Sequence, residues 1–459
     1  MNTSENNRNS TKKRNKILLG CMAAALAVSI SVPVWLHAHR TGWEEKDGQH
    51  YYYMDGKPAT GWLRMEEGAY YFNEDGTRLS GWLEEDGLHR YFDQNGLMVE
   101  NGIVTEDGQR RLILDGVMAT GLNRYDGSFY YLDEEGVMAT GWMDLDGDRW
   151  YFDPETGCAP TGLQEIDGVT YAFAPHGPLA SGWLETDGVT YRISDEGTPL
   201  PGGWHEIDGA TYYLDEDGSL YQGWLEDGGH TYYIQNGLYT TGILPLEDRN
   251  YFFDSRGWQV LMVNPWNTVP EVYEVSLSDV GGGHSIASEA AVDFANMIYT
   301  LQQLEMGPII TSSYRSGTRQ QEIFDERVAK YMGQGMTEEE AFALTATSVA
   351  IPGTSEHQLG LAMDMTDAQY NKLDEGQMET PTQLWLIENS WRYGFILRYP
   401  EGRSEITGII YEPWHYRHVG KELAAELYEL GLTLEEYLDM LTEDKSLTAS
   451  NPENGNTMK

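Results

Sequence analysis

The stretch Gly-Trp-His-Glu-Ile-Asp-Gly-Ala-Thr-Tyr-Tyr-Leu, residues 203–214, shows the unit from which the first half of this chain is built. Two short aromatic segments flank the dipeptide Asp208-Gly209, and glycine accepts the positive φ that a tight hairpin turn requires. We therefore predict a β-hairpin over this stretch. One hairpin cannot bury its aromatic face alone, so its stability must come from neighbouring copies.

The same pattern recurs over residues 42–261 at intervals of 19 to 21 residues. Each unit opens with a glycine, at Gly42, Gly61, Gly81, Gly102, Gly121, Gly141, Gly162, Gly182, Gly203, Gly223 and Gly242. A tryptophan follows this glycine at Trp43, Trp62, Trp82, Trp142, Trp183, Trp204 and Trp224. The period predicts a β-hairpin solenoid of about 20-residue repeats, in which each unit is stabilised by its neighbours.

These repeats resemble the cell-wall-binding repeats of Gram-positive surface proteins, a broad family that includes choline-binding and glucan-binding modules. The resemblance implies a cell-wall polysaccharide or a choline-like ligand. Ring faces and carboxylates attract quaternary ammonium, so the seven tryptophans are ligand-binding candidates. The alternative is that these rings form only the core of the repeats. Choline-binding repeats typically carry Trp before the Tyr pair, where this chain has residues such as His50, Ala69 and Thr211, so the ligand stays open.

After Leu261 the aromatic repeats stop and helical periodicity begins, which predicts a separate α+β domain over residues 262–440. Helices are predicted from Ala287 to Leu304, from the capping box at 337–340 to Thr345, and from Gly420 to Leu430. Short strands are predicted over residues 308–313, 361–365, 395–398 and 406–411. The polar residues 441–459 are predicted to form a disordered tail.

The first 38 residues carry the signature of an exported chain. A basic segment, residues 1–16, precedes an apolar run over residues 17–38 that is long enough to span a bilayer. The basic flank predicts a cytoplasmic N-terminus and a signal-anchor transmembrane helix, which places the protein in the cell membrane, single-pass, with its C-terminal part outside and associated with the wall. The alternatives are a cleaved signal peptide, which would make the protein secreted, and lipidation at Cys21.

The formal net charge of -43 argues against a nucleic-acid partner, because phosphates would be repelled. The two cysteines, Cys21 and Cys158, lie far apart, so no structural disulfide is expected. An exported chain without disulfides fits a Gram-positive bacterium.

A second decisive stretch is Ser-Glu-His-Gln-Leu-Gly-Leu-Ala-Met-Asp, residues 355–364, followed some fifty residues later by Glu-Pro-Trp-His at 412–415. His357, Asp364 and His415 can hold one zinc ion and leave a position open for water. The remaining Glu412 can act as the general base. His418 is a rival ligand at His-x-x-His spacing, but it has no acidic helical motif around it and is expected not to bind the metal.

The patterns Ser-x-His-x-x-Gly-x-Ala-x-Asp and Glu-x-Trp-His resemble the signature of the VanY-type D-alanyl-D-alanine carboxypeptidases and the related L,D-carboxypeptidases. The resemblance extends to residues 263–267, 313–316 and 393–395. It implies a zinc metallo-carboxypeptidase, not a serine-type enzyme, with His357, Asp364 and His415 as ligands of one zinc ion and Glu412 as the catalytic base. It also implies that Arg315 engages the substrate carboxylate or the developing oxyanion, assisted by Gln320 and Ser355.

The resemblance implies a D,D-carboxypeptidase that removes the C-terminal D-alanine from peptidoglycan stem peptides while the repeats hold it at the wall. Two alternatives stay open from the residues alone. The enzyme could be an L,D-carboxypeptidase acting on tetrapeptide stems. The protein could also be a non-catalytic cell-wall-binding surface protein, although the full set of ligands and base argues against that reading.

Overall fold

The computed structural model describes residues 40–444. The predicted basic segment (1–16), the predicted signal-anchor helix (17–38) and most of the predicted tail therefore lie outside the described residues. Between residues 40 and 444 no helix is long and apolar enough to cross a membrane. The chain divides into two compact units, one containing residues up to Thr161 together with Pro175–Leu179, the other containing Gly162–Ala174 and the chain from Ala180 onward.

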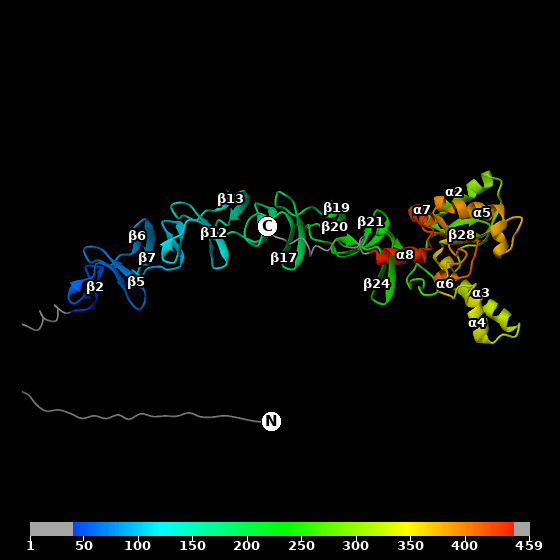
Figure 1. Ribbon diagram of the computed structural model, residues 1–459, viewed down its shortest axis with the longest axis horizontal. Helices are drawn as coiled ribbons and strands as arrows, with labels where there is room; N and C mark the ends of the chain where they lie inside the picture. The colour runs from blue at the N-terminus through cyan, green and yellow to red at the C-terminus, as the bar shows by residue number, and fades with distance from the viewer. Residues whose placement is uncertain (1–39, 445–459) are drawn as a thin grey trace, which may run out of the picture. The chain divides into compact units, whose positions relative to one another are not determined.

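The first unit consists of successive antiparallel hairpins, coloured blue to cyan in Figure 1. Their paired strands are β1 (Gly42–Lys46) with β2 (Gln49–Met54), β4 (Gly61–Arg64) with β5 (Ala69–Phe72), β6 (Gly81–Glu85) with β7 (Leu88–Phe92), β8 (Gly102–Glu106) with β9 (Gln109–Leu114), β11 (Gly121–Tyr125) with β12 (Ser128–Leu132), and β13 (Gly141–Leu145) with β14 (Asp148–Phe152). Short third strands, β3 (Lys57–Pro58) and β10 (Val117–Met118), extend two of these sheets.

The Asp-Gly dipeptides form the turns that the sequence predicts. Lys46 pairs with Gln49, which leaves Asp47 and Gly48 as a two-residue loop. Their φ angles are +55° and +76°, and positive φ at both positions is the mark of a type I′ turn. This local choice fixes the register and places Trp43 opposite Tyr52 on the neighbouring strand.

Successive hairpins stabilise one another through their aromatic rings. The Trp43 ring packs against Tyr52 of its own hairpin, with ring centroids 5.3 Å apart, and against Tyr70 of the next hairpin at 5.2 Å. Phe72 and Phe92, at corresponding positions of successive units, are fully buried. The prediction that each repeat depends on its neighbour is therefore confirmed.

The second unit begins with five further hairpins and two short strands. The pairs are β15 (Gly162–Ile166) with β16 (Val169–Phe173), β17 (Gly182–Thr186) with β18 (Val189–Ile193), β19 (Gly203–Ile207) with β20 (Ala210–Leu214), β21 (Gly223–Asp227) with β22 (His230–Gln235), and β24 (Gly242–Leu246) with β25 (Arg249–Phe253). The short strands are β23 (Leu238–Tyr239) and β26 (Gln259–Val260). Every repeat glycine named above opens the first strand of a hairpin.

The α+β domain is built around a four-stranded antiparallel sheet. Its order is β29 (Pro308–Ser312), β30 (Ala362–Asp367), β32 (His415–His418) and β31 (Phe395–Leu397). A hairpin of β27 (Leu277–Gly281) and β28 (His284–Ala287) precedes it. The helices are α2 (Ser288–Gln303), α3 (Gly317–Met332), α4 (Glu338–Ala346), α5 (Pro381–Asn389), α6 (Ser404–Thr407), α7 (Lys421–Leu430) and α8 (Leu434–Glu443), with short 3-10 turns η1 (Glu356–Leu359), η2 (Glu375–Glu379) and η3 (Ser390–Tyr393).

The core of this domain lies between α2 and the sheet. Every residue of β30 is buried, and Met363 and Met365 of that strand belong to one apolar cluster with Phe294 and Leu301 of α2. The helices α3 and α4 pack against each other, and Figure 1 shows them together in yellow-green. A strand with all its side chains buried is held rigidly, so β30 is a fixed platform for a polar residue that faces a site.

The predicted helices and strands agree with the structure except in one segment. The predicted helix from Ala287 to Leu304 corresponds to α2, and Thr337 forms the predicted capping box with Glu340 at the start of α4. The predicted strand over residues 406–411 is wrong. The backbone N–H of Gly408 donates to Ser404 in a helical turn, and Gly408, with φ of +75°, ends that turn. The strand was predicted because the segment contains the β-branched apolar residues Ile406, Ile409 and Ile410, which are common in strands.

The last hairpin shares a core with the end of the chain. Phe252 and Val260 are buried in one cluster with Tyr437, Leu438 and Leu441 of α8. Figure 1 shows α8, in red, beside β24. The helix continues to Glu443, beyond the predicted domain boundary at residue 440.

Candidate active site

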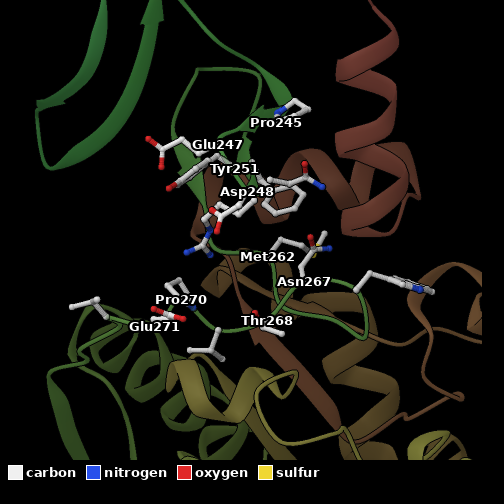
Figure 2. Close-up of a pocket in the computed structure, with 15 residues that line it drawn as sticks. Pro245, Glu247, Asp248, Tyr251, Met262, Asn267, Thr268, Pro270 and Glu271 are labelled. Atoms are coloured by element: carbon white, nitrogen blue, oxygen red, sulfur yellow. The ribbon is translucent and has the colours of Figure 1, made fainter.

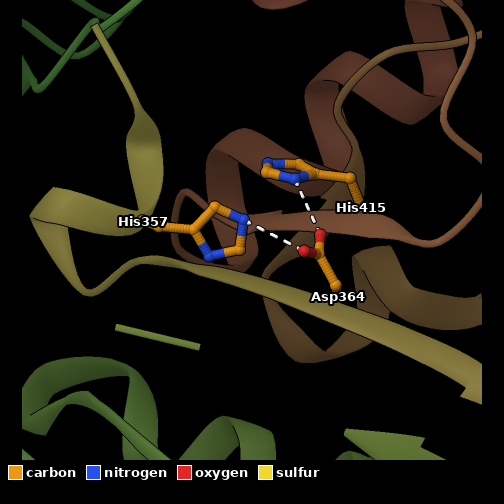
Figure 3. Close-up of side chains that lie close together, drawn as sticks. All are labelled: His357, Asp364 and His415. Carbon is orange, nitrogen blue, oxygen red and sulfur yellow. Dashed lines mark hydrogen bonds and ion pairs between the residues drawn. The ribbon is translucent and has the colours of Figure 1, made fainter. Parts of the chain in front are cut away.

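Three side chains from separate elements meet at one buried point, as Figure 3 shows. His357 lies in the turn η1, Asp364 lies on β30, and His415 is the first residue of β32. Asp364 and His415 are direct cross-strand partners, so strand pairing alone brings these two residues together. Their exposed fractions are only 2% for His357, 7% for Asp364 and 4% for His415.

Each imidazole faces Asp364 with one ring nitrogen and a second acceptor with the other. His357 Nε2 lies 3.3 Å from Asp364 Oδ2, while its Nδ1 lies 2.8 Å from the backbone oxygen of Ser313. His415 Nδ1 lies 3.0 Å from Asp364 Oδ1, while its Nε2 lies 3.4 Å from Glu356 Oε2. One potential ligand atom from each of the three residues lies within 4.8 Å of the other two.

Gly360 makes the approach of His357 to Asp364 possible. It ends η1 in the left-handed region with φ of +73°, and its backbone oxygen accepts a hydrogen bond from the N–H of Ala287. A Cβ at this position would lie 3.1 Å from the Ala287 nitrogen. The chain therefore bends at this glycine, and the bend turns it from His357 into β30.

The charges of the cluster are strongly coupled. Burial by itself would raise the pKa of Asp364, but the two imidazoles hold that pKa well below its usual range. Burial lowers the pKa of His357. Burial would also lower the pKa of His415, yet its hydrogen bonds to Asp364 and Glu356 outweigh burial and raise that pKa to about 9. A lowered pKa favours the anionic form of Asp364, which is the form that binds a metal ion.

Glu412 lies beside the cluster without forming part of it. The backbone oxygen of Glu412 accepts a hydrogen bond from the backbone N–H of His415, so the turn through Pro413 and Trp414 brings the two residues close together. Glu412 Oε2 is 3.8 Å from His415 Nδ1, and the residue is 8% exposed. Burial raises the pKa of Glu412 to about 8, partly offset by His415. A buried carboxyl with a pKa near neutrality suits proton transfer.

The other predicted site residues lie at different distances from the cluster. Arg315 is half-buried after β29; burial lowers its pKa, against the attraction of Asp364 and Glu412. Ser355 is buried immediately before η1. Gln320 is buried on α3 and donates from Nε2 to the backbone oxygen of Ala350. His418 is not part of the cluster, because its Nε2 lies 3.2 Å from Asp293 Oδ2 on α2.

The sequence analysis missed Glu356, which contacts the His415 ring, and the two arginines that bind Glu356. Glu356, Arg398 and Arg417 are each about 1% exposed, and both arginines form ion pairs with Glu356. The signal in the sequence was Glu356 itself, a charged residue directly before His357 in a segment that becomes buried. Its partners stand some forty and sixty residues later and could not be matched to it without the fold.

The repeat tryptophans divide into two groups by what covers their rings. Arginine guanidinium groups lie 4.7 to 5.8 Å from the ring centroids of Trp43, Trp62, Trp82, Trp142 and Trp183. Within residues 40–444, no arginine or lysine lies over Trp204 or Trp224. The Trp204 ring instead meets three tyrosines, Tyr213, Tyr232 and Tyr239, at centroid distances of 4.9, 5.2 and 6.2 Å.

A separate pocket of about 890 Å³ lies between the turn of the last hairpin and the start of the α+β domain (Figure 2). Its walls include Glu247, Asp248 and Glu271, with Trp266 and Val272 at its edge, 64% and 90% exposed. None of the residues of the His-Asp-His cluster, nor Glu412, lines it. This pocket is therefore separate from the residues predicted to be catalytic.

Two histidines and an aspartate around one buried point, with a carboxyl poised beside them, form the site of a metallopeptidase. Residues 283–421 match the family described as VanY: D-alanyl-D-alanine carboxypeptidase. Residues 59–102 and 119–159 match a choline-binding repeat, and residues 202–220 match a cell wall binding repeat.

A D-alanyl-D-alanine carboxypeptidase of Enterococcus faecalis is 43% identical over 188 residues, which is 40% of this chain and 68% of that protein. Among solved structures, the vancomycin resistance D,D-pentapeptidase VanY in complex with Zn(II) is 43% identical and has a TM-score of 0.36, with 39% of this chain and 97% of that chain covered. The LD-carboxypeptidase LdcB is 34% identical with a TM-score of 0.34, covering 39% and 84%. The chain belongs to the VanY D-alanyl-D-alanine carboxypeptidase family.

Proposed function

We propose that this protein is a zinc-dependent D,D-carboxypeptidase that removes the C-terminal D-alanine from peptidoglycan stem peptides. The observation that carries the proposal is the convergence of His357, Asp364 and His415 on one point, with the buried Glu412 beside them. Membership of the VanY family supports the choice of a peptide that ends in D-alanine.

The donor set fits a zinc ion. Two imidazole nitrogens and one carboxylate oxygen are the ligands that catalytic zinc sites use, and three protein ligands leave a fourth position open. Each histidine also has the outer hydrogen-bond acceptor that orients a metal-binding imidazole, namely the Ser313 oxygen for His357 and Glu356 for His415. These contacts support one zinc ion per chain at this cluster.

The reaction divides among the chain's own groups. A bound zinc ion would polarise the scissile carbonyl and lower the pKa of water at the site. Glu412 accepts the proton of the attacking water and returns it to the departing D-alanine amine. Arg315 holds the free carboxylate of the terminal D-alanine by a charge-assisted hydrogen bond, with Ser355 and Gln320 assisting it. A guanidinium beside the cluster thus favours a substrate with a free carboxyl end over an internal peptide bond.

The same arrangement accommodates a tetrapeptide stem. Pentapeptide and tetrapeptide stems both end in a D-alanine with a free carboxylate, so Arg315 engages either one. They differ in the residue before the scissile bond, which is D-alanine in one case and an L-centre in the other. The L,D-carboxypeptidase activity is therefore the alternative, and relative turnover of the two stems separates them.

The repeats associate the enzyme with the cell wall. Trp204 and Trp224, over whose rings no arginine of residues 40–444 lies, offer an aromatic surface to a choline-like cation or to a wall polysaccharide. At Trp204 the indole N–H already donates to Asp227 Oδ2 at 3.0 Å, which places a carboxylate at the edge of the rings. Aromatic faces and a carboxylate together favour a cationic ligand.

The apolar residues 17–38 would anchor the protein in the membrane of a Gram-positive cell, with the repeats and the enzyme outside. This arrangement brings the site close to newly inserted stem peptides. If residues 1–39 are replaced by a cleavable signal peptide, we expect the protein to be found in the medium, while the full chain sediments with membranes in cell fractionation. A mature N-terminus near residue 39 on the full chain would instead show a cleaved signal.

The test of the function is release of D-alanine from purified muropeptides. We expect release from pentapeptide stems, loss of release on chelation, and recovery on addition of zinc. Faster release from tetrapeptide stems would establish the L,D alternative. A protein that holds no zinc and releases no D-alanine from either stem would be a non-catalytic wall-binding protein, and the proposal would be wrong.

A further inference from the structure

A buried ion-pair network contacts the ring nitrogen of His415 that does not face Asp364. Glu356 Oε1 accepts from Arg398 Nε at 2.8 Å and from the terminal guanidinium nitrogen of Arg417 at 2.9 Å. Glu356 Oε2 is left for His415 Nε2, at 3.4 Å. The one carboxylate therefore joins two guanidinium groups to an imidazole of the metal cluster.

The buried charges of this network are balanced by ion pairs and hydrogen bonds. The side chains of Glu356 and Arg398 are 0% exposed and that of Arg417 is 2% exposed. Arg398 also binds Glu435 of α8 through two nitrogens, at 2.8 and 2.6 Å. Two carboxylates and two guanidinium groups cancel in charge, and each charge has hydrogen-bond partners, as a buried ion pair requires. Removing these charges from water costs free energy that their mutual attraction need not repay, so stability alone does not explain the network.

We infer that Glu356 is a positioning residue of the active site, which fixes the ring orientation and tautomer of His415 for metal binding. An imidazole that donates its Nε2 proton to Glu356 keeps the lone pair of Nδ1, and Nδ1 is the nitrogen that faces Asp364. Arg398 and Arg417 hold the carboxylate by its other oxygen, so it cannot rotate away. The inference rests on the proposed zinc site.

The two histidines are thus positioned by different means. The outer nitrogen of His357 meets a backbone oxygen, that of Ser313, which no side-chain substitution removes. The outer nitrogen of His415 meets a side chain whose place depends on distant segments. Arg417 donates to the backbone oxygen of Leu261 at 2.7 Å, and Asn264 donates to Glu435 Oε1 at 3.0 Å. The two arginines thus also contact the junction after the last repeat and α8, while the carboxylate of Glu356 is held by both guanidinium groups together.

The test compares two substitutions in one network, Glu356→Gln and Glu435→Gln, in the full chain. In the Glu356→Gln variant the amide oxygen stays with the guanidinium groups and the NH2 group faces His415 Nε2, which disfavours the donating tautomer. We expect zinc affinity, measured by competition with a chromogenic chelator, to fall about 10- to 100-fold, as for other residues that orient a ligand. We expect kcat to fall while KM changes little, and the absorption spectrum of the Co(II)-substituted protein to shift.

Glu435→Gln is the matched control, because Glu435 binds Arg398 but makes no contact with His415. It should lower thermal stability as Glu356→Gln does and leave the zinc affinity and the Co(II) spectrum at their wild-type values. Should Glu356→Gln fail to fold, Glu356→Asp keeps the charge beside the arginines and withdraws the oxygen from His415; we then expect a folded protein with weakened zinc binding.

The inference is overturned if the folded Glu356 variant binds zinc as tightly as the wild type, or if Glu435→Gln weakens zinc binding equally, which would show a merely structural role. These readouts do not depend on the substrate. A protein that released no D-alanine would defeat the proposed function, while the difference in zinc affinity between the two variants would still decide the role of Glu356.

Discussion

Arginine serves the repeats and the enzyme domain in contrasting ways. In the repeats, guanidinium groups such as Arg90 and Arg111 lie over the faces of partly exposed tryptophans, where each contact contributes about 0.5–1 kcal/mol. In the enzyme domain, Arg398 and Arg417 are almost fully buried and hold Glu356 against His415. The same side chain therefore gives modest local packing at the surface and strict positioning in the interior, because the low dielectric strengthens every charge interaction there.

The two regions also differ in how far a disturbance should travel. A hairpin repeat contacts its sequence neighbours, so its stability is a local property. The last repeat and the enzyme domain, in contrast, join residues separated by nearly two hundred positions, since the N–H of Ile243 donates to Thr442 Oγ1. A substitution in an early repeat should therefore destabilise only that repeat and its neighbours. A substitution in the core that the last repeat shares with the enzyme domain should also affect the active site.

The largest effect is expected from Glu412→Gln. Loss of the general base should reduce D-alanine release by about 10²- to 10⁴-fold, while wall binding by the repeats is unchanged. The measurement is kcat/KM on a pentapeptide stem beside sedimentation with purified walls. Glu405→Gln, at an exposed residue of α6, is the control and should keep full activity. Comparable activity in both variants would remove Glu412 from the mechanism.

A core substitution in the last hairpin should act on the enzyme, whereas the same substitution in an early hairpin should not. Phe252→Ala leaves a cavity in the cluster shared with α8 and should destabilise the enzyme domain by about 3–5 kcal/mol. Phe92→Ala removes a fully buried ring from the first unit. The measurement is the half-life of peptidase activity on heating. We expect a much shorter half-life for Phe252→Ala and no change for Phe92→Ala; equal effects would contradict the shared core.

Acid should weaken the metal-free enzyme domain through Glu356. Burial would raise the pKa of this carboxyl, but Arg398 and Arg417 hold it well below its usual range. Because the pKa is lower in the folded than in the unfolded chain, where it is about 4.3, ionised Glu356 stabilises the fold above that pH and the stabilisation is lost as pH falls. Urea midpoints measured from pH 6 to pH 3 should therefore decline. Glu356→Gln should start lower and decline less steeply, and an identical slope would count against this assignment.

The smallest effect is expected at the repeat rings. Trp204→Ala removes a face that no cation of residues 40–444 covers and should weaken binding to walls or to a choline analogue by a factor that corresponds to about 0.5–2 kcal/mol. Trp82→Ala removes a ring that Arg111 already covers and should change binding less. Equilibrium binding of both variants, each verified as folded by circular dichroism, gives the comparison. A greater loss for Trp82→Ala would reverse the assignment of the ligand surfaces.

The accuracy of the sequence predictions follows from the range of the interactions involved. The hairpins were predictable because an Asp-Gly turn sets its own register, as at Asp47 and Gly48. The segment 406–411 was predicted incorrectly because its apolar pattern suits a strand, while a single left-handed glycine, Gly408, ended a helical turn instead. The local sequence pattern predicts secondary structure well where the backbone geometry of a turn fixes the strand register. It fails in a short segment whose residues suit both a strand and a helical turn.

The sequence by itself determined the repeat period, the type I′ turns and the set of residues able to hold a metal, because each depends on residue type and spacing along the chain. Only the tertiary structure decided that Asp364 pairs directly with His415, that Glu356 supports the outer nitrogen of His415, and that the last repeat shares a core with α8. These are contacts between segments far apart in sequence, whose geometry is set by packing of the whole domain rather than by any local preference.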